Sequence, residues 1–507
     1  MNALIPLYVI VPLASAFIMA ILGRLIKNFG KAVLILELLF LTCLTFSFIL
    51  NSQGTLVYKV GGFPDTGDIP IAIYMVIDGL SKLLLLIISV VGLLTALFSS
   101  SYTREYTAER KFYVLFSLMI AGMNGIVISG DIFNIYVFLE IAAISSYILV
   151  AFGVEKHQLE ASFKYQVLGC LASLMILLAI GFIYWGTGTL NIADISRQLP
   201  YSAHFVKFVS ILFLVGFGLK AAIFPFHSWL PDAHSSAPSP ISAMLSGVLI
   251  KAIGIYVLFR IFFSMFALSY QMSVTFTVLG TLSMVIGGLM AIGQWDFKRL
   301  LAFHSISQMG YVIVGVGIGM ILLTTGGSKT IAAFSIFGGL FHMVNHSVFK
   351  GLLFLNAGSV EYATGTRDLR KLGGLAEKMP ITASTSMVAS FAISGIPPFN
   401  GFFSKLIIIV AAVSAQYYWV ALFAVIVSII TISSFMKVQK YVFFNTPKRS
   451  YKNFRAIPLP MKFSMIIMAL LCLLLSMLVL SPIRDIFITP AVDALINTLQ
   501  YSAAVIG

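Results

Sequence analysis

Residues 218–234 read GLKAAIFPFHSWLPDAH, in which Lys220 precedes Pro225 by five positions inside an apolar run. Proline removes a backbone donor and clashes with the preceding turn, so we expect a helix to break near Pro225. Hydrocarbon cannot satisfy the carbonyls that such a break frees, so a broken helix inside a membrane lines protein or a watery cavity. This segment therefore predicts a polar element within an apolar span.

A second break is expected near Pro397 and Pro398, in SGIPPFNGFFSK (residues 394–405), which ends on Lys405. Interrupted apolar segments in corresponding halves of a chain are typical of inverted-repeat transport proteins. We therefore expect two inverted five-helix repeats, each containing a broken helix. The expected units are residues 1–111 (helices 1–3), 112–263 (first repeat), 264–440 (second repeat) and 441–507 (helix 14 and the C-terminal tail).

The composition outside these segments is that of a polytopic membrane protein. Of the 507 residues, 59% are hydrophobic and only 10% are charged, whereas a soluble chain carries about 25% charged residues. Apolar runs that can each cross the hydrocarbon core predict an all-α membrane protein with about 14 transmembrane helices. We place them near residues 4–23, 31–50, 73–98, 112–129, 131–152, 164–186, 205–224, 240–263, 273–293, 302–322, 331–355, 380–413, 416–440 and 462–481.

Basic residues are distributed unequally between the two sets of loops. Of the 32 Lys and Arg residues, loops on one side hold 21, whereas the opposite loops and the C-terminal tail hold six. Positive loops stay cytoplasmic, so we expect a multi-pass protein of the cell (inner) membrane with both termini outside. This also explains the net charge of +14 without a nucleic acid partner.

The cysteines give no sign of redox chemistry. Cys43, Cys170 and Cys472 stand alone, without the spacing of a metal or disulfide motif. We expect no cofactor, no metal site and no catalytic redox centre in this chain, although it could be the ion-translocating part of a redox-driven translocase.

Five lysines fall inside apolar runs: Lys82, Lys220, Lys251, Lys350 and Lys405. A lysine at mid-membrane costs at least about 2.5 kcal/mol, so each needs a partner or has a use. Glu140 is an anionic counterpart near the bilayer centre, because it lies about 13 Å along a helix from Asp131. Lys82 follows Asp78 by four positions near the start of its run, so an ion pair with Asp78 or snorkelling to the interface is the alternative to a function there.

His342, His346 and Lys350 are spaced four residues apart and share one helix face. Imidazoles titrate near neutral pH and pass protons through either nitrogen, so this face is a candidate proton relay. Structural hydrogen bonding remains open, and a metal site is disfavoured because no Glu completes an H-E-x-x-H pattern. Three further histidines could extend the relay or line an access route, or could serve packing alone: His227, His234 and His304.

Four segments resemble one family of membrane proteins. They are LPDAHSSAPSP (230–240), KRLLA (298–302), DGLS (78–81) and GIPPF (395–399). The chain resembles the antiporter-like subunits shared by Mrp-type Na+/H+ antiporters, respiratory complex I and membrane-bound hydrogenases, and it looks most like the D subunit of the antiporters.

The resemblance implies fourteen helices with breaks in helices seven and twelve. It also implies a charged central row made of Glu140, Lys220, Lys251 and Lys405, with His342, His346 and Lys350 connecting the half-channels. Some relatives carry Glu at the position of Lys405, so this lysine argues against that branch.

Residues and resemblance together predict a proton-translocating subunit of a multisubunit cation (Na+)/proton antiporter. Its expected partners are other membrane subunits, including homologous antiporter-like and small helical ones, together with lipid and protons, while passage of Na+ through this chain stays open. One alternative is the proton- or sodium-pumping membrane subunit of a complex I-like dehydrogenase or membrane-bound hydrogenase. A stand-alone solute transporter, which would need a wider polar cavity, and a purely structural anchor are the others.

Overall fold

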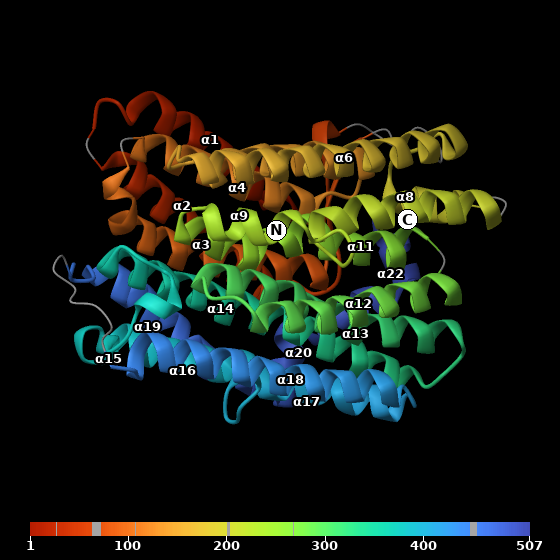
Figure 1. Ribbon diagram of the computed structural model, residues 1–507. Coiled ribbons are helices and arrows are strands. Elements are labelled where there is room, and N and C mark those ends of the chain that lie inside the picture. Colours follow the sequence, from red (N-terminus) through yellow and green to blue (C-terminus); the bar gives the residue numbers. More distant parts are fainter. Residues whose placement is uncertain are drawn as a thin grey trace.

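The computed structural model describes residues 1–26, 28–62, 72–106, 108–199, 203–266, 268–446 and 454–506. Within these ranges, 13 helices are long and apolar enough to cross a membrane. One further crossing is divided between α16 (Pro380–Ser394) and α17 (Asn400–Ser414), which confirms the expected all-α membrane fold of about fourteen spans. The helices lie side by side with roughly parallel axes, so the loops gather at the two ends of the bundle (Figure 1).

The helices follow one another along the chain as successive crossings. The first five are α1 (Leu7–Leu22), α2 (Phe29–Asn51), α3 (Gly79–Tyr102), α4 (Glu109–Ile128) and α5 (Ile132–Val150). The middle ones are α6 (Lys156–Thr187), α8 (Ala203–Ala221) with α9 (Trp229–Ser236), a rod over Ser239–Met265, α12 (Tyr270–Ile292), α13 (Phe297–Thr324) and α14 (Lys329–Thr364). The last are α16 with α17, α18 (Tyr418–Val438) continued by η8 (Gln439–Phe444), and α19 (Leu459–Leu474) continued by η9 (Leu475–Val479).

Shorter elements complete the chain. The rod consists of α10 (Ser239–Met244), η4 (Leu245–Leu249), η5 (Lys251–Ile255), α11 (Tyr256–Arg260) and η6 (Ile261–Met265). The short helices are α7 (Ile192–Gln198), α15 (Leu375–Lys378), α20 (Ser481–Phe487), α21 (Thr489–Ile496) and α22 (Thr498–Ile506), and the single turns are η1 (Asn2–Leu4), η2 (Val60–Gly62), η3 (Thr103–Glu105) and η7 (Leu369–Lys371). Two strands, β1 (Leu56–Lys59) and β2 (Tyr74–Ile77), pair antiparallel with Leu56 opposite Ile77.

The hairpin corrects one predicted boundary. The apolar run that predicts a helix from residue 73 begins as β2, and the helix starts only at Gly79. Asp78 sets this start, because its side chain accepts a hydrogen bond from the Ser81 backbone N–H at 2.9 Å. The hairpin also returns the chain to the end of α2, so the start of α3 lies beside it.

The core of the bundle is made of the rod, α13 and α14. Every residue of the rod is buried, as is every residue of α14 from Ser335 to Val360. A helix that is apolar nearly all round belongs inside other helices, so polar groups on these three elements are shielded from lipid. Lys251 and the histidines of α14 therefore lie where water can reach them only through the protein.

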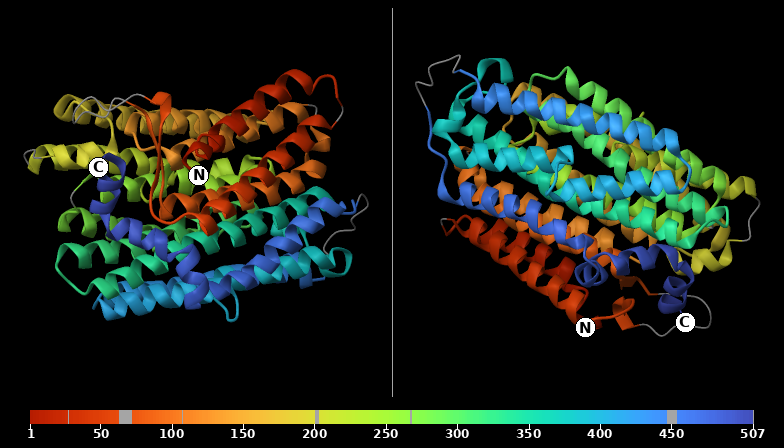
Figure 2. Two further views of the ribbon diagram at one scale, coloured as in Figure 1. Left: turned by 180° about the vertical axis from the view of Figure 1, so that it is seen from behind. Right: turned by 90° about the horizontal axis from the view of Figure 1, so that it is seen from below.

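The two ends of the bundle differ in the elements that they carry. We call the end with Lys298, Arg299 and Arg367 the basic-loop face, and the opposite end, which carries α20–α22, the terminal face. In Figure 1, α15 lies at the basic-loop face on the left and α22 lies toward the right. Figure 2 shows the C-terminal segment, in dark blue, beside the red and orange N-terminal helices, in agreement with the packing of α21 against α3.

Candidate functional site

The first broken helix is confirmed. α8 ends at Ala221, and Ala222 adopts a left-handed conformation with φ 52° before Pro225. The carbonyl of Leu219, in the last turn before the break, accepts hydrogen bonds from the Ala222 backbone N–H at 3.2 Å and from the indole N–H of Trp229 at 2.9 Å. The break is therefore stabilised by protein groups, as a membrane interior requires.

The second broken helix, at Pro397 and Pro398, is also confirmed. α16 ends before Gly395, whose φ of 80° suits glycine, and α17 begins at Asn400. The ammonium of Lys405 donates to the carbonyl of Ile393 at 2.8 Å, so the lysine of the second half-helix caps the end of the first. The two half-helices are in contact at Gly401, where a Cβ would clash with the carbonyl oxygen of Ala392.

Glu140 and Lys220 lie together at the first break. The Lys220 Nζ is 3.8 Å from Glu140 Oε1 and donates to the Tyr147 hydroxyl at 3.3 Å. The Ser173 hydroxyl donates to the same glutamate oxygen. The Lys220 side chain is 1% exposed, whereas that of Glu140 is 28% exposed between α5 and α6. Glu140 therefore lies at the edge of the bundle, and Lys220 lies inside the bundle beside it.

Lys251 has no carboxylate as a hydrogen-bond partner in the part of the chain that the structure describes. Its ammonium donates to the carbonyls of Ser246 and Gly247, at 2.8 and 2.7 Å, in the preceding π-helical segment η4. The wider π-helical turn supplies these acceptors within the same rod. The Ser246 hydroxyl is also hydrogen-bonded to that of Ser305 on α13 at 2.7 Å, which ties the two halves of the chain together.

The relay residues of α14 are fully buried, but they differ in their partners. His342 Nδ1 lies 2.9 Å from the Ser404 hydroxyl, and its Nε2 lies 3.1 Å from the Gln308 side-chain oxygen. Lys350 donates to the Leu301 carbonyl at 2.5 Å. Neither ring nitrogen of His346 has a hydrogen-bond partner among the residues that the structure describes. His346 is therefore able to bind water or to take part in proton transfer.

The weaker histidine candidates separate into two kinds. His234 and His304 are completely buried, and neither ring nitrogen has a partner in the described ranges. The ring centroids of His304 and Phe435 are 5.0 Å apart, and those of His234 and Phe354 are 5.7 Å apart. His227, at the first break, is only half-buried beside Phe224.

The elements that carry the predicted site residues are in direct contact with one another. Ala221, next to Lys220, touches the rod at Gly254, where a Cβ would lie 2.5 Å from the Ala221 Cβ. At Gly247 a Cβ would lie 3.1 Å from the carbonyl oxygen of Ser347, the residue after His346 on α14. On α14, His342 reaches Ser404, which precedes Lys405. The row therefore runs from the Glu140 edge through the rod and α14 to the second break.

The expected ion pair between Asp78 and Lys82 is wrong. Asp78 accepts two hydrogen bonds from the guanidinium of Arg260, at 2.7 and 2.9 Å, and both side chains are buried. Lys82 donates instead to the carbonyl of Ser52 at 2.8 Å. We counted Arg260 among the six basic residues of the opposite loops, but it lies inside the bundle. It is 182 positions from Asp78 in the sequence, so no local spacing could have paired them.

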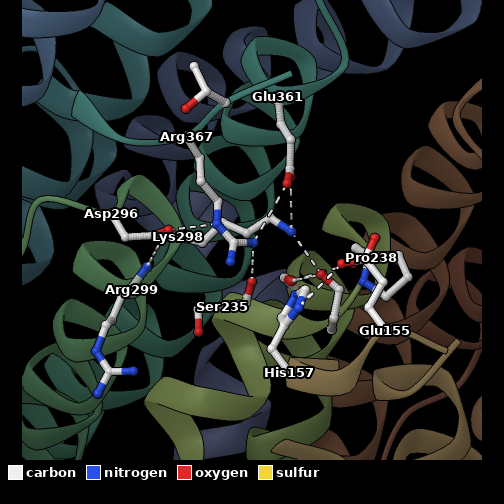
Figure 3. A network of polar contacts seen from close by, with 12 residues as sticks. Glu155, His157, Ser235, Pro238, Asp296, Lys298, Arg299, Glu361 and Arg367 are labelled. Carbon is white, nitrogen blue, oxygen red and sulfur yellow. Dashed lines mark hydrogen bonds and ion pairs between the residues drawn. The ribbon is translucent and has the colours of Figure 1, made fainter. Parts of the chain in front are cut away.

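A polar network at the basic-loop face was also missed (Figure 3). Lys298 is buried and donates to the Ala237 carbonyl at 2.8 Å, while Arg367 donates to the Ser235 carbonyl at 2.5 Å. Glu361 bridges these two cations at 3.4 and 3.6 Å. Two side chains of the second half therefore hold the C-terminal end of α9, which belongs to the first.

Arg367 of this network stays charged. Burial lowers the pKa of its guanidinium, but the carboxylates of Asp296 and Glu361 outweigh burial and raise the pKa above its ordinary value. Arg367 also donates to Asp296 at 2.6 Å. The end of α9 is therefore held by a fixed positive charge rather than by a group that titrates near neutral pH.

Residues 129–431, more than half of the chain, match the family described as NADH:quinone oxidoreductase/Mrp antiporter, transmembrane. The chain belongs to this family. It is 32% identical, over 89% of both chains, to the D subunit of the Na(+)/H(+) antiporter of Alkalihalophilus pseudofirmus.

Solved structures agree with this membership. A chain of the Mrp complex from Dietzia sp. DQ12-45-1b superposes with a TM-score of 0.89 at 26% identity, covering 100% of this chain and 99% of that one. A chain of the membrane-bound sulfane sulfur reductase, an archaeal respiratory membrane complex, superposes with a TM-score of 0.88 at 29% identity and 99% coverage of both. Both of these similar chains are subunits of larger membrane complexes.

Proposed function

We propose that this chain is the proton-translocating membrane subunit of a multisubunit cation (Na+)/proton antiporter. One observation carries the proposal: a buried lysine beside a glutamate opens a row of buried amines and imidazoles that ends at a second broken helix. The similarity to the D subunit of an antiporter over nearly the whole chain supports this interpretation.

The Glu140–Lys220 pair is the switch of the proposed mechanism. While the carboxylate lies beside the amine, the ammonium form is favoured and a proton is held. When the pair opens, the ammonium stands alone in a low-dielectric interior, where its charge is costly, and it releases the proton. The interaction is strong only because Lys220 is shielded from water.

The proton then passes along Lys251, His346, His342 and Lys405, with Lys350 beside them. Lys251, Lys350 and Lys405 donate to backbone carbonyls, which accept from an amine as well as from an ammonium. Neither nitrogen of His346 is bonded to a described residue, and His342 sits between Gln308 and Ser404. We assign His234 and His304 to supporting positions near this route and His227 to its access at the first break.

Proton uptake fits a cavity of about 330 Å³ at the basic-loop face. Four carboxylates line it, together with two basic side chains: Glu155, Asp296, Glu361 and Asp368, with Lys298 and Arg367. A locally negative mouth concentrates protons even on a face that is otherwise rich in basic loops. We place the uptake side here.

Glu140 also indicates where a partner docks. An anion that is 28% exposed on the lipid-facing side of α5 and α6 is costly in hydrocarbon. A neighbouring membrane subunit covering these two helices would remove that cost and could move the carboxylate. We propose that an antiporter-like or small helical subunit binds there, so that the partner controls the switch.

The proposed organisation keeps the expected units. Residues 112–263 and 264–440 are the two inverted repeats, after the helices of 1–111 and before the segment 441–507. In support, Lys220 ends the half-helix before the first break and Lys405 lies in the half-helix after the second. We also propose that the basic-loop face is cytoplasmic in the cell membrane, with both termini outside.

The test uses the whole complex in sealed vesicles with an imposed Na+ gradient and a pH-sensitive dye. Lys220→Met should abolish proton movement while the amount of assembled complex stays unchanged. A wild-type rate in this variant would contradict the proposal. A stand-alone solute transporter would instead retain full activity as the isolated chain.

A redox-driven complex is the second candidate, because the respiratory sulfane sulfur reductase chain superposes almost as well as the Mrp chain. Purification in mild detergent separates the two. Companion subunits with iron–sulfur or nickel centres would identify a redox-driven translocase, and a complex of membrane subunits alone would identify an antiporter.

A further inference from the structure

A cavity on the terminal face lies away from the row of Glu140 and Lys405. It measures about 520 Å³ and is formed by the end of α2, the start of α3 and the C-terminal helices α20–α22. The wall is close-fitting at Gly79, where a Cβ would clash with the carbonyl oxygen of Pro490. Polar side chains line much of it, so it is both roomy and polar enough to hold water.

Lys82 lies in the lining of this cavity. The residue is 8% exposed, and its ammonium donates to the Ser52 carbonyl at 2.8 Å. The nearest acid in sequence, Asp78, already accepts two hydrogen bonds from Arg260. Among the described residues no carboxylate forms an ion pair with Lys82, so a neutral acceptor holds this amine.

Tyr501 of α22 closes the cavity next to the ion pair. It is 3% exposed, and its ring lies 4.9 Å from the Arg260 guanidinium carbon. Tyr501 is part of the cavity lining, and its buried hydroxyl has no hydrogen-bond partner within the described ranges. A buried hydroxyl without a protein partner is normally hydrogen-bonded to water, which is a second reason to regard the cavity as hydrated.

Hydrogen bonds lead inward from the cavity toward the rod. The Ser81 hydroxyl, next to Lys82, is 3.3 Å from the Tyr256 hydroxyl of the rod, and both hydroxyls donate to the Val127 carbonyl of α4, at 3.0 and 2.6 Å. Tyr256 follows Lys251 by five positions, which is about 7.5 Å along a helix. The cavity therefore opens near the outer end of the element that carries Lys251.

We propose that Lys82 is a proton-exchange group in addition to the row from Lys220 to Lys405. It passes protons between the solution on the terminal face and the rod. On release, an N–H bond of the ammonium breaks and its proton goes to cavity water, while the neutral amine keeps its hydrogen bond to the Ser52 carbonyl. A proton delivered from the rod then binds the amine lone pair and restores the ammonium. The other charged side chains in the cavity lining are Asp78, which is paired with Arg260, and Asp485 and Asp493. The transport role, though not the accessibility of the amine, rests on the proposed function above.

If Lys82 had a purely structural role, it would only cap the C-terminal end of α2 at the Ser52 carbonyl. Arginine distinguishes the two roles, because it keeps the charge and the donors but does not release its proton. Lys82→Arg and Lys82→Met are therefore compared with Lys207→Arg, which changes an exposed lysine at the same end of the bundle.

The experiment uses the whole complex in sealed vesicles of known orientation. A membrane-impermeant amine-acetylating reagent is added from each side at several pH values, and the modified peptides are measured by mass spectrometry. We expect Lys82 to be acetylated from the terminal face only, and increasingly as the pH rises. We expect both Lys82 variants to slow proton movement by at least about tenfold, the lower range of an acid–base contribution, with Lys207→Arg unchanged.

Two outcomes would overturn the inference. One is a Lys82 that reacts from neither side or from the basic-loop face. The other is a Lys82→Arg complex that moves protons at the wild-type rate, which would leave the lysine a capping role. Both differ from failure of the proposed function, which would show as normal transport by Lys220→Met.

Discussion

Replacing Glu140 by Gln tests the switch with little change of shape. The glutamine oxygen can still accept the Ser173 hydrogen bond, so folding should be preserved. Unit charges 3.8 Å apart, the separation of Lys220 Nζ and Glu140 Oε1, interact by about 4 kcal/mol at an effective dielectric of 20. At effective dielectrics between about 20 and 40, this interaction amounts to about 2–4 kcal/mol. At about 1.4 kcal/mol per tenfold change, the proton held at Lys220 should become about 30- to 700-fold less favoured.

The assay follows Na+-driven proton movement into sealed vesicles with a pH-sensitive dye, normalised to the amount of chain in the membrane. We expect Glu140→Gln to move protons at least about 30-fold more slowly, as the Coulomb energy above requires. Glu160→Gln is the matched control, because Glu160 pairs with Lys164 on the exposed side of α6, where an ion pair contributes little to stability. Transport by Glu140→Gln at more than half the wild-type rate would refute the switch.

Three other changes separate transport from stability. His346→Phe should leave the thermal stability of the detergent-solubilised complex nearly unchanged, because no described residue bonds to its nitrogens, but should stop Na+-driven proton movement; a normal rate would remove it from the route. Gly401→Ala should prevent close packing of the two half-helices and lower the melting temperature, whereas Gly181→Ala, at an open helical position, should be neutral or slightly stabilising; equal effects would contradict the packing argument. Asp78→Asn and Arg260→Met should each destabilise the chain by about 3–5 kcal/mol, because each leaves a buried charge without its partner. The double variant should lose less stability than the sum of the two single losses. Additive losses in a double-mutant cycle of thermal unfolding would show that the two side chains act independently.

The sequence was sufficient for features that depend on one segment. Prolines in apolar runs predict both breaks, since the missing donor acts locally, and the burial of Lys251 follows from its depth in a long apolar run. Periodicity also places His342, His346 and Lys350 on one face. The hairpin before α3 was missed because its strands are only four residues long and the second continues into an apolar run.

The partners of these groups could not be predicted from local sequence. Asp78 lies four residues from Lys82, yet it pairs with Arg260, because helix packing brings a guanidinium with two donors onto the carboxylate. Lys298 and Arg367 look like ordinary loop charges, but tertiary contacts place them on the carbonyls that end α9. Long-range pairing of this kind depends on helix order and rotation, which no spacing along one helix encodes.

The irregular backbone and the buried lysines act together. Lys405 donates to a carbonyl freed at a helix break, Lys251 donates to two carbonyls of a π-helical segment, and Lys350 donates to a carbonyl of α13. A carboxylate partner would hold an amine in its charged form, whereas a carbonyl accepts a hydrogen bond from either form. These three lysines can therefore change protonation state without losing their partner. Lys220 has a carboxylate nearby, and for that reason control of the row should reside in the Glu140–Lys220 pair.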